Sequence, residues 1–246
     1  MTSPAENVLF APGSSEPEDE EADVLLAALL TSARRIAGCE RVVDALPRIA
    51  EGAVAVVPGV RDAGVAIRGR GGLSCAAHTT ETAASVDRAQ LRTAEGPCID
   101  TVGGAGAVVL SDVTTETRWP RFVPEAVRHG VRASLSVPFT TACPAAALNL
   151  HLTRRTLDDR SARVRTLRHA QLFAVYASLA LAGTDRVENL ERALERRDVI
   201  GQAKGILMRH YGVDADEAFG RLRRASQSTN TKLHVIAGWL VARRTP

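Results

Sequence analysis

The sequence predicts an α+β fold, in which an antiparallel sheet flanked by helices is followed by a connecting helix and an all-α unit of three helices. Three observations predict it. Short extended runs separated by turn signals occupy much of residues 63–153. Helical periodicity then continues from Asp158 to Gly212. Two short amphipathic helices follow Gly212. We expect residues 22–183 to form the sheet domain and residues 184–246 the connecting helix and the helical unit.

The N-terminal segment differs from the rest in composition. Residues 1–21 are rich in Pro, Ser and Glu, which predicts a disordered acidic tail because such a segment buries too little apolar surface to offset its ordering entropy. It lacks the basic and then apolar pattern of a signal peptide, and no run of 18 apolar residues follows anywhere. We therefore expect a cytoplasmic protein without a membrane span.

The sheet domain opens with helical periodicity in residues 22–38 and 40–57, the second with a bend near Pro47. The runs "AGVAIRG" and "LSCAAHT" are joined by "RGRGG", which is typical of a hairpin. "AVVLSD", "RASLSVPF" and "AAALNLHLT" are further strands, and the last two are expected to pair. Between "AVVLSD" and "RASLSVPF", the segment "RWPRFVPEAVRHG" predicts a helix that Trp119 anchors at its start and that ends at Gly130.

The long helical pattern after Asp158 predicts a connecting helix that pairs with a second copy of the chain. Val187, Leu190 and Leu194 form a short apolar seam, which Arg197 and Gly201 interrupt, so a long heptad repeat is not expected. The predicted pairing face comprises Leu172, Val175, Leu179, Val187, Leu190 and Leu194, although the sheet domain could bury the first three.

The two last helices carry clear start signals. Asp214 and Glu217 have the spacing of a capping box, and Ala218, Phe219 and Leu222 are predicted to face the core. In the final helix the apolar residues recur at helical spacing, and Asn230 is one of several polar residues that could cap it.

These C-terminal residues carry a resemblance. "IGQAKGILM" followed by "DADEAFGRLRRASQSTNTKLHVIAGWLV" resembles the ANTAR domain, a three-helix RNA-binding module of transcription antitermination regulators. Upstream, "AEGPCIDTV", "VLSDVTTETRWPRFVPEAVRHGVRASLSVPF" and "AALNLH" resemble the GAF domain that is fused to ANTAR in actinobacterial regulators. The resemblance implies a GAF sensor that controls binding to paired hairpins in a nascent transcript, which prevents a terminator from forming.

The charge distribution is compatible with this implication. Residues 186–246 contain twelve bases and seven acids, a surplus of 12 − 7 = 5 positive charges. Lys204 is one of two lysines in the chain, the other being Lys232, and small residues flank it in "GQAKG". The predicted RNA-binding residues are Gln202, Lys204, Arg209, Arg223, Arg224, Ser226, Asn230 and Lys232. Tyr211 and Trp239 are the candidates for stacking on bases, and we assign Phe219 to the core.

Other chemistries find little support in the sequence. The four cysteines are far apart and no histidine has metal-ligand spacing, so neither a disulfide framework nor a metal site is expected, and Cys98 is predicted to pack as a small apolar residue. A P-loop, a nucleophile elbow, a zinc-protease motif and a complete dinucleotide fingerprint are all lacking, so we expect no enzyme and no cofactor. The GAF resemblance leaves room for an unidentified small-molecule ligand, while residues associated with cyclic-nucleotide binding are missing.

Two alternatives to the RNA-binding interpretation stay open at this point. The chain could be a GAF protein that senses a ligand and dimerises without binding RNA. It could also be a DNA-binding transcription regulator.

Overall fold

The structure is a computed structural model that describes residues 17–69, 71–140, 146–152, 157 and 159–243, with side chains from Asp23 onward. The chain divides into two compact units, residues 1–184 and 185–246. Among the described residues, no helix is long and apolar enough to cross a membrane. Residues 1–16, most of the predicted acidic tail, lie outside the described part, as does Cys143.

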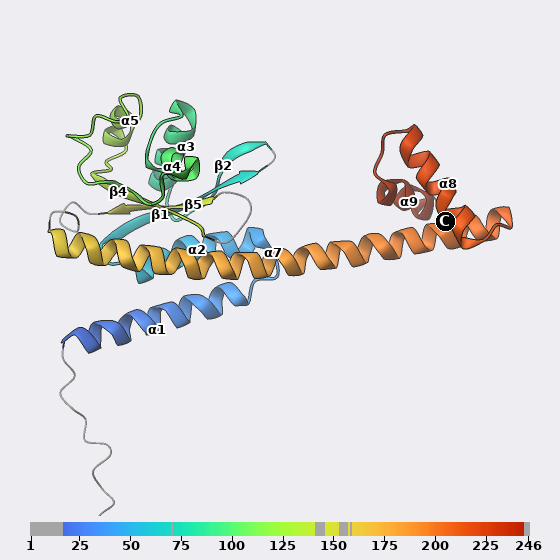
Figure 1. Cartoon of the computed structure of the whole chain (residues 1–246), viewed down its shortest axis with the longest axis horizontal. Coiled ribbons are helices and arrows are strands. Elements are labelled where there is room, and N and C mark those ends of the chain that lie inside the picture. The colour runs from blue at the N-terminus through green and yellow to red at the C-terminus, as the bar shows by residue number, and fades with distance from the viewer. Residues whose placement is uncertain (1–16, 70, 141–145, 153–156, 158, 244–246) are drawn as a thin grey trace, which may run out of the picture. The chain divides into compact units, whose positions relative to one another are not determined.

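The first unit is built on a five-stranded sheet, which confirms the predicted α+β class (Figure 1). Its strands are β1 (Val60–Gly69), β2 (Gly72–His78), β3 (Val108–Leu110), β4 (Ala133–Pro138) and β5 (Ala146–Leu152). Their order in the sheet is β2-β1-β5-β4-β3, and every neighbouring pair is antiparallel. Both predicted pairings, the hairpin of β1 with β2 and the pairing of β4 with β5, are confirmed.

Helices cover both faces of this sheet (Figure 1). On one face lie α2 (Val42–Val56) and the first part of α7 (Arg160–Tyr211), with α1 (Pro17–Ala37) packed on α2. On the other face lie α3 (Glu81–Thr93), α4 (Pro97–Asp100), the π-helix η1 (Thr101–Ala105) and α5 (Phe122–Arg128). The helix α1 includes residues 17–21, which were predicted to belong to the tail, and α3 was not expected from the sequence.

The main core lies between the sheet and the α2 and α7 helices. Alternate residues of β5, namely Leu148, Leu150 and Leu152, point into it, and Phe173 of α7 is fully buried there. Helices α1 and α2 approach closely at Gly52, where an added Cβ would lie 2.1 Å from the Ser32 hydroxyl oxygen. Glycine at this position therefore permits the packing of α1 on α2.

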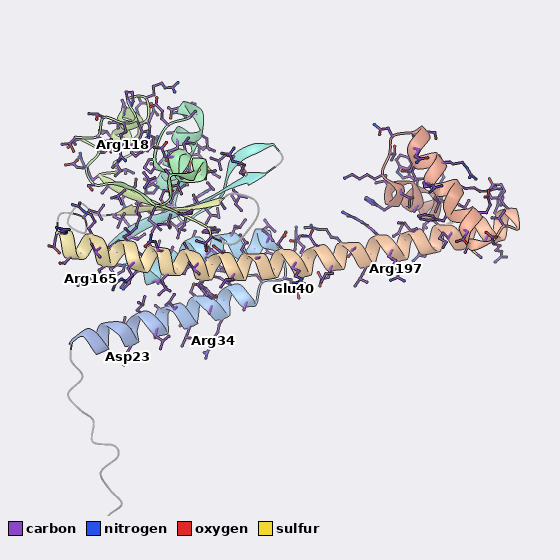
Figure 2. All side chains as sticks on the ribbon, viewed as in Figure 1. Asp23, Arg34, Glu40, Arg118, Arg165 and Arg197 are labelled. Carbon is purple, nitrogen blue, oxygen red and sulfur yellow. The ribbon has the colours of Figure 1, made fainter. Side chains whose placement is uncertain are left out.

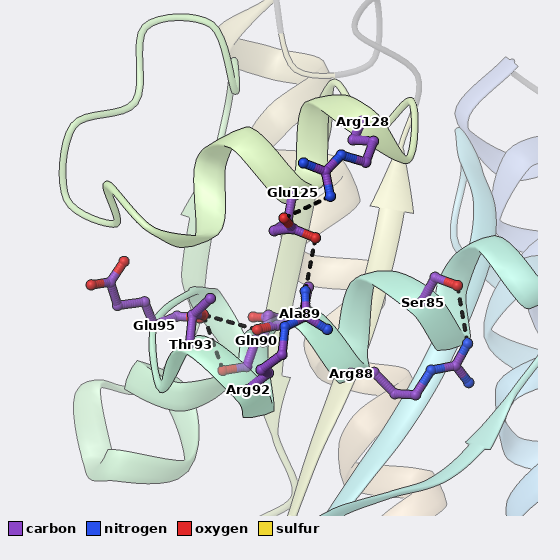
Figure 3. Close-up of polar contacts among 9 residues, drawn as sticks. All are labelled: Ser85, Arg88, Ala89, Gln90, Arg92, Thr93, Glu95, Glu125 and Arg128. Carbon is purple, nitrogen blue, oxygen red and sulfur yellow. Dashed lines mark hydrogen bonds and ion pairs between the residues drawn. The ribbon is translucent and has the colours of Figure 1, made fainter.

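Aromatic anchors and ion pairs fix the helices on the opposite face. Trp119 is buried, and its Nε1 donates a hydrogen bond to Asp100 at 3.0 Å while its carbonyl accepts from Phe122 and Val123 at the start of α5. This confirms the predicted anchoring role of Trp119. On the surface, Glu125 accepts hydrogen bonds from both Arg92 and Arg128 (Figure 3), which ties α3 to α5.

The second unit contains the end of α7, then α8 (Ala215–Ser228) and α9 (Leu233–Ala242), which confirms the three predicted helices. Its small core consists of Ala203, Leu222 and Ala237 with half-buried aliphatic neighbours. The carboxylate of Asp214 accepts from the backbone N–H groups of Asp216 and Glu217, so it caps α8 as predicted. The Glu217 carboxylate instead accepts hydrogen bonds from Arg221 and Arg224, and none from the backbone N–H of the cap residue among the described residues.

The helix α7 contains a stretch that packs against no other described element. From Asp185 to Asp198 every residue except the half-buried Glu188 is exposed. Side chains leave the ribbon on several sides here, Arg197 among them (Figure 2). A single helix of this length gains little stability from backbone hydrogen bonds alone.

Candidate nucleic-acid interface

Lys204 lies at the edge of the core of the second unit. Its neighbour Ala203 is fully buried, whereas Lys204 is half-buried and extends toward α8. The Lys204 Nζ atom lies 5.9 Å from the ring centroid of Phe219, within the range of a cation–π contact. Among the described residues, no ion pair or hydrogen bond of the Lys204 ammonium is found, so its donors are available to a ligand.

Phe219 was assigned to the core by the sequence analysis, and this assignment is wrong. Its side chain is 40% exposed, because Ala218 and Leu222 occupy the face of α8 that packs on α7. Arg223 lies four residues after Phe219, hence on the same face of the helix, and is exposed. We call Lys204, Phe219 and Arg223 the Lys204 surface: an exposed aromatic ring with Lys204 over it and Arg223 on the same face of α8.

Two of the predicted binding residues do not share this surface. Gln202 and Arg209 lie about 160° and about 140° around α7 from Lys204, since each residue advances the helix by about 100°. Both are exposed, and Gln202 Nε2 donates to Asp198 at 3.0 Å. Lys204 and Arg209 therefore lie on different sides of α7, and RNA contacts by Gln202 and Arg209 stay predictions.

Arg224 and Ser226 are engaged within the protein. Arg224 donates to Glu217 at 2.9 Å, on a different side of α8 from Arg223, and hydrogen bonds from Arg224 and Arg221 hold the pKa of Glu217 below its usual value. The Ser226 hydroxyl donates to the carbonyl of Thr231 at 2.6 Å and so stabilises the turn between α8 and α9. Base contacts by these two residues stay predictions.

The turn itself carries the last two predicted residues. Asn230 is exposed and left-handed, with φ 50°, a conformation that Asn tolerates better than most residues. It does not cap α9: the N-cap position is Lys232, which forms no side-chain cap bond. The capping role considered for Asn230 is therefore incorrect, and both residues expose polar groups beside α9.

The end of the chain is uniformly cationic. After Glu217 the sequence contains no acidic residue, whereas its bases are Arg221, Arg223, Arg224, Lys232, Arg243 and Arg244, the last of which lies outside the described residues. Such a segment attracts polyanions, in a manner that salt weakens.

All three aromatic residues of the second unit are exposed. Tyr211, Phe219 and Trp239 are 54%, 40% and 58% exposed. Arg221 lies over the Tyr211 ring with its guanidinium carbon 4.4 Å from the centroid. The unit therefore combines exposed rings with cations, the combination that binds unpaired bases and their phosphates.

The first unit contains a second feature, a buried polar cluster beneath α3. On the sheet face opposite the main core, Asn149 donates to Asp87 at 2.9 Å and accepts from Ser136 at 2.8 Å. Gln90 donates to Asp87, and its oxygen accepts from the backbone of Cys98. This network links α3, α4, β4 and β5.

Two groups in this interior are incompletely paired. The Asp87 Oδ2 atom has no hydrogen-bond partner among the described residues, and neither ring nitrogen of the buried His151 has one. Burial raises the pKa of Asp87 to about 7, opposed by the hydrogen bonds from Asn149 and Gln90. Burial also lowers the pKa of His151 to about 4, so this imidazole is neutral at physiological pH.

Burial also disfavours ionisation of the two thiols near this cluster. Cys98 is buried, as predicted, and burial raises its pKa to about 12, while burial raises the pKa of the half-buried Cys75 to about 11. Thiolates are thus disfavoured at both positions. Within the described ranges, no cluster of three or more His, Cys, Asp or Glu residues could hold a metal ion.

Comparison with known protein families now adds an independent observation: the ANTAR domain matches residues 188–241. Residues 188–241 form an ANTAR domain. ANTAR domains are RNA-binding domains of the antiterminator family, and the Lys204 surface, Tyr211 and Trp239 all lie within the matched range. A search of curated proteins found no match.

Comparison with solved structures finds similar chains of low sequence identity. The phytochrome photosensory core module of Stigmatella aurantiaca shares 11% identity, with 83% of this chain and 45% of that chain covered and a TM-score of 0.53. A bacteriophytochrome of R. palustris shares 10% identity, covering 79% and 44%, with a TM-score of 0.52. A GAF domain from a phosphoenolpyruvate-protein phosphotransferase of Coxiella burnetii shares 11% identity, covering 67% and 96%, with a TM-score of 0.49. The sheet with its flanking helices is the part of the chain whose sequence resembles a GAF domain, and we call it the GAF-like unit.

Proposed function

We propose that the chain is a signal-responsive RNA-binding regulator that promotes transcription antitermination. Its ANTAR domain binds hairpins in nascent RNA, and its GAF-like unit controls that binding. The observation that carries the proposal is the Lys204 surface, inside a domain of an RNA-binding family. There an exposed ring lies beside Lys204 and shares a helix face with Arg223, and neither cation pairs with a carboxylate among the described residues. The protein acts by binding, not as an enzyme.

The chemistry of a hairpin suits this surface. A hairpin loop displays unpaired bases beside closely spaced phosphates, and RNA recognition concentrates on such loops. Phe219 offers a ring for stacking, while Lys204 and Arg223 offer donors to phosphate oxygens. Capture of a hairpin in this way would hold the transcript in a form that excludes the terminator.

Electrophoretic competition tests the choice of ligand. RNA that is recovered with the full chain and identified by sequencing supplies the hairpin probe, and unlabelled hairpin RNA, single-stranded RNA and duplex DNA compete for it. The proposal predicts that hairpin RNA competes best. Preferential competition by duplex DNA would favour the DNA-binding alternative, and failure to bind any nucleic acid would favour the sensing protein without RNA binding.

Pairing of two chains through α7 is part of the proposal. The candidate residues Leu172, Val175, Leu179, Val187, Leu190 and Leu194 are all at least 38% exposed, so the first unit does not bury the first three. Val187, Leu190 and Leu194 belong to the stretch of α7 that no other described element covers. An exposed apolar seam on an unsupported helix is stabilised when a second copy covers it.

Charges beside the seam indicate how the two helices would be oriented. With Val187 and Leu190 at positions a and d of a heptad, Arg186 occupies position g and Glu191 the following position e. In a parallel pair, Arg186 of one chain faces Glu191 of the other. Both side chains are exposed, and neither has a hydrogen bond or ion pair within the described part of the chain. A dimer would present two ANTAR domains to a two-hairpin target, which raises avidity.

Charge exchange tests this pairing. Glu191→Arg alone should weaken the dimer on the order of tenfold, since two symmetric attractions of up to about 1 kcal/mol become repulsions. Adding Arg186→Glu should restore the dimer. Leu190→Glu with Leu194→Glu should give monomers that lose the gain from a second hairpin. Sedimentation with RNA titration measures these effects, and a wild-type chain that stays monomeric on a two-hairpin RNA would end the model.

Signal control would begin at the GAF-like unit. We propose that an unidentified small-molecule ligand of this unit carries the signal. Such a ligand would shift the chain between RNA-competent and incompetent pairings only by its difference in affinity for the two. A thermal-shift screen of small metabolites on the full chain would identify it, and ligand-dependent hairpin affinity would establish control.

A further inference from the structure

The helix α9 presents an apolar surface to solvent. Its core-facing side contains Ala237, which is fully buried. On the opposite side, Trp239 is 58% exposed, although indole rings are normally well buried or held at interfaces. A surface hollow of about 680 Å³ lies beside this ring, and its lining comprises Ile236, Trp239, Leu240, Ala242 and Arg243.

The lining of this hollow selects a ligand class. Four of the five residues are apolar, and the fifth is a cation, so the hollow suits a flat apolar group that is attached to an anion. The size is within the range of about 300–1,000 Å³ that is usual for small-ligand sites. A nucleotide has this combination, because its base stacks on aromatic rings while its phosphate pairs with arginine.

The surrounding charge favours RNA over a second copy of the chain. No acidic residue occurs in residues 218–246, so the hollow lies in a uniformly cationic segment. A symmetric contact between two copies would bring the same cationic patch of each together. A polyanion encounters attraction instead.

We propose that the hollow beside Trp239 binds one unpaired base of the RNA, which stacks on the indole while Arg243 pairs with the adjoining phosphate. The inference rests on the proposed RNA-binding function and adds a base subsite to it. The subsite is distinct from the Lys204 surface, since its lining residues belong to α9 and its C-cap residue Arg243, whereas those of the Lys204 surface come from α7 and α8.

Substitution of Trp239 separates stacking from simple apolar contact. Trp239→Phe keeps an aromatic ring, Trp239→Leu keeps apolar bulk without a ring, and Trp239→Ala removes both. With the full chain and the hairpin RNA recovered by sequencing, Trp239→Leu and Trp239→Ala should each weaken binding roughly 5- to 150-fold, the range for loss of one stacked base. Trp239→Phe should retain most of the affinity. Unchanged circular dichroism and melting would show that these variants fold.

Tryptophan emission provides a direct readout of the ring. Trp119 is buried and contributes background emission. The Trp239→Phe variant contains Trp119 as its one tryptophan, so its emission measures this background. Hairpin RNA should quench the Trp239 emission in step with binding, whereas a fully paired RNA of equal length should not. The inference would be overturned if Trp239→Leu bound the RNA as tightly as wild type. It would also be overturned if the Trp239 emission changed with protein concentration in the absence of RNA, because that change would indicate a second copy of the chain in the hollow. If Lys204→Ala weakens binding while every Trp239 variant binds normally, the base subsite is wrong and the proposed function stands; a chain that binds no RNA overturns both.

Discussion

The two units place their aromatic side chains in opposite environments. In the first unit Trp119, Phe122 and Phe173 are each at most 3% exposed and fill the two cores on either side of the sheet. In the second unit Tyr211, Phe219 and Trp239 are at least 40% exposed, and the core is built from alanine and aliphatic residues instead. Aromatic rings thus support stability in the first unit and remain available to a ligand in the second.

The cations differ in the same way. In the first unit Arg92 and Arg128 share Glu125, Arg121 pairs with Glu95, and Arg118 pairs with Glu116. In the second unit Lys204 and Arg223 have no carboxylate partner among the described residues, although Arg221 and Arg224 pair with Glu217. Cations that are already neutralised contribute little to RNA binding, whereas unpaired ones release counterions when they meet phosphates.

The largest expected effect contrasts two phenylalanines. Phe173→Ala should lower the free energy of unfolding of the first unit by about 3–5 kcal/mol, because it leaves a cavity in a closed core. Phe219→Ala should cost much less stability, because its ring is already 40% exposed, and should instead weaken hairpin binding. Denaturant unfolding and RNA titration of both variants check this. A large stability loss from Phe219→Ala, with unchanged RNA affinity, would return Phe219 to a structural role.

A smaller effect concerns pH and should appear in the first unit alone. The pKa of Asp87 is raised to about 7 by burial, so the folded state binds its proton more tightly than the unfolded state. The stabilisation from this proton is complete below the unfolded pKa of about 4 and is lost as the pH rises through about 7. Asp87→Asn keeps an oxygen for Gln90 and Asn149 and removes the charge.

The free energy of unfolding of wild type and of Asp87→Asn is measured from about pH 5 to about pH 8. This interval of about three pH units includes the pKa of Asp87 in the folded state. Wild-type stability should fall over this interval relative to Asp87→Asn. If the free energy of unfolding varied with pH in the same way in both proteins, the pKa of Asp87 in the folded state would not be raised to about 7.

The smallest effect concerns the N-cap of α8 in the second unit. Asp214→Ala removes the acceptor for the Asp216 and Glu217 N–H groups and should lower the stability of the ANTAR domain by about 1 kcal/mol. Asp214→Ser, which retains a capping oxygen, is the matched control and should recover most of that loss. Melting of the second unit measures both variants; equal melting of Asp214→Ala and wild type would contradict the cap.

Sequence periodicity predicted most of the fold because the relevant signals are local. The hairpin, the pairing of β4 with β5, the cap at Asp214 and the helix end at Gly130 each depend on residues close together in the chain. The helix α3 was missed, since its buried face includes Asp87 and Gln90 next to small residues and lacks an apolar stripe. Only the sheet reveals why these polar residues are buried, because their partner Asn149 lies 62 residues away from Asp87.

The candidate interface was predictable in part. Because an α-helix has about 3.6 residues per turn, Gln202 and Arg209 lie on other sides of α7 than Lys204, and the sequence alone was enough to predict this. The exposure of Phe219 could not have been predicted from the sequence. It depends on how closely α8 packs on α7 through Ala203, Ala218 and Leu222. The four-residue spacing of Phe219 and Arg223 was the available signal that this ring shares a face with a cation.

The most direct test of the account measures hairpin affinity against salt for wild type, Lys204→Ala and Arg209→Ala. Both substitutions remove one exposed or half-exposed cation from α7, on different sides of the helix. If RNA binds at the Lys204 surface, Lys204→Ala should weaken binding at physiological salt and lower the slope of log affinity against log salt by about one. Arg209→Ala should change both quantities less. Equal affinity and slope for Lys204→Ala and wild type would contradict the Lys204 surface as the place where the ANTAR domain meets RNA.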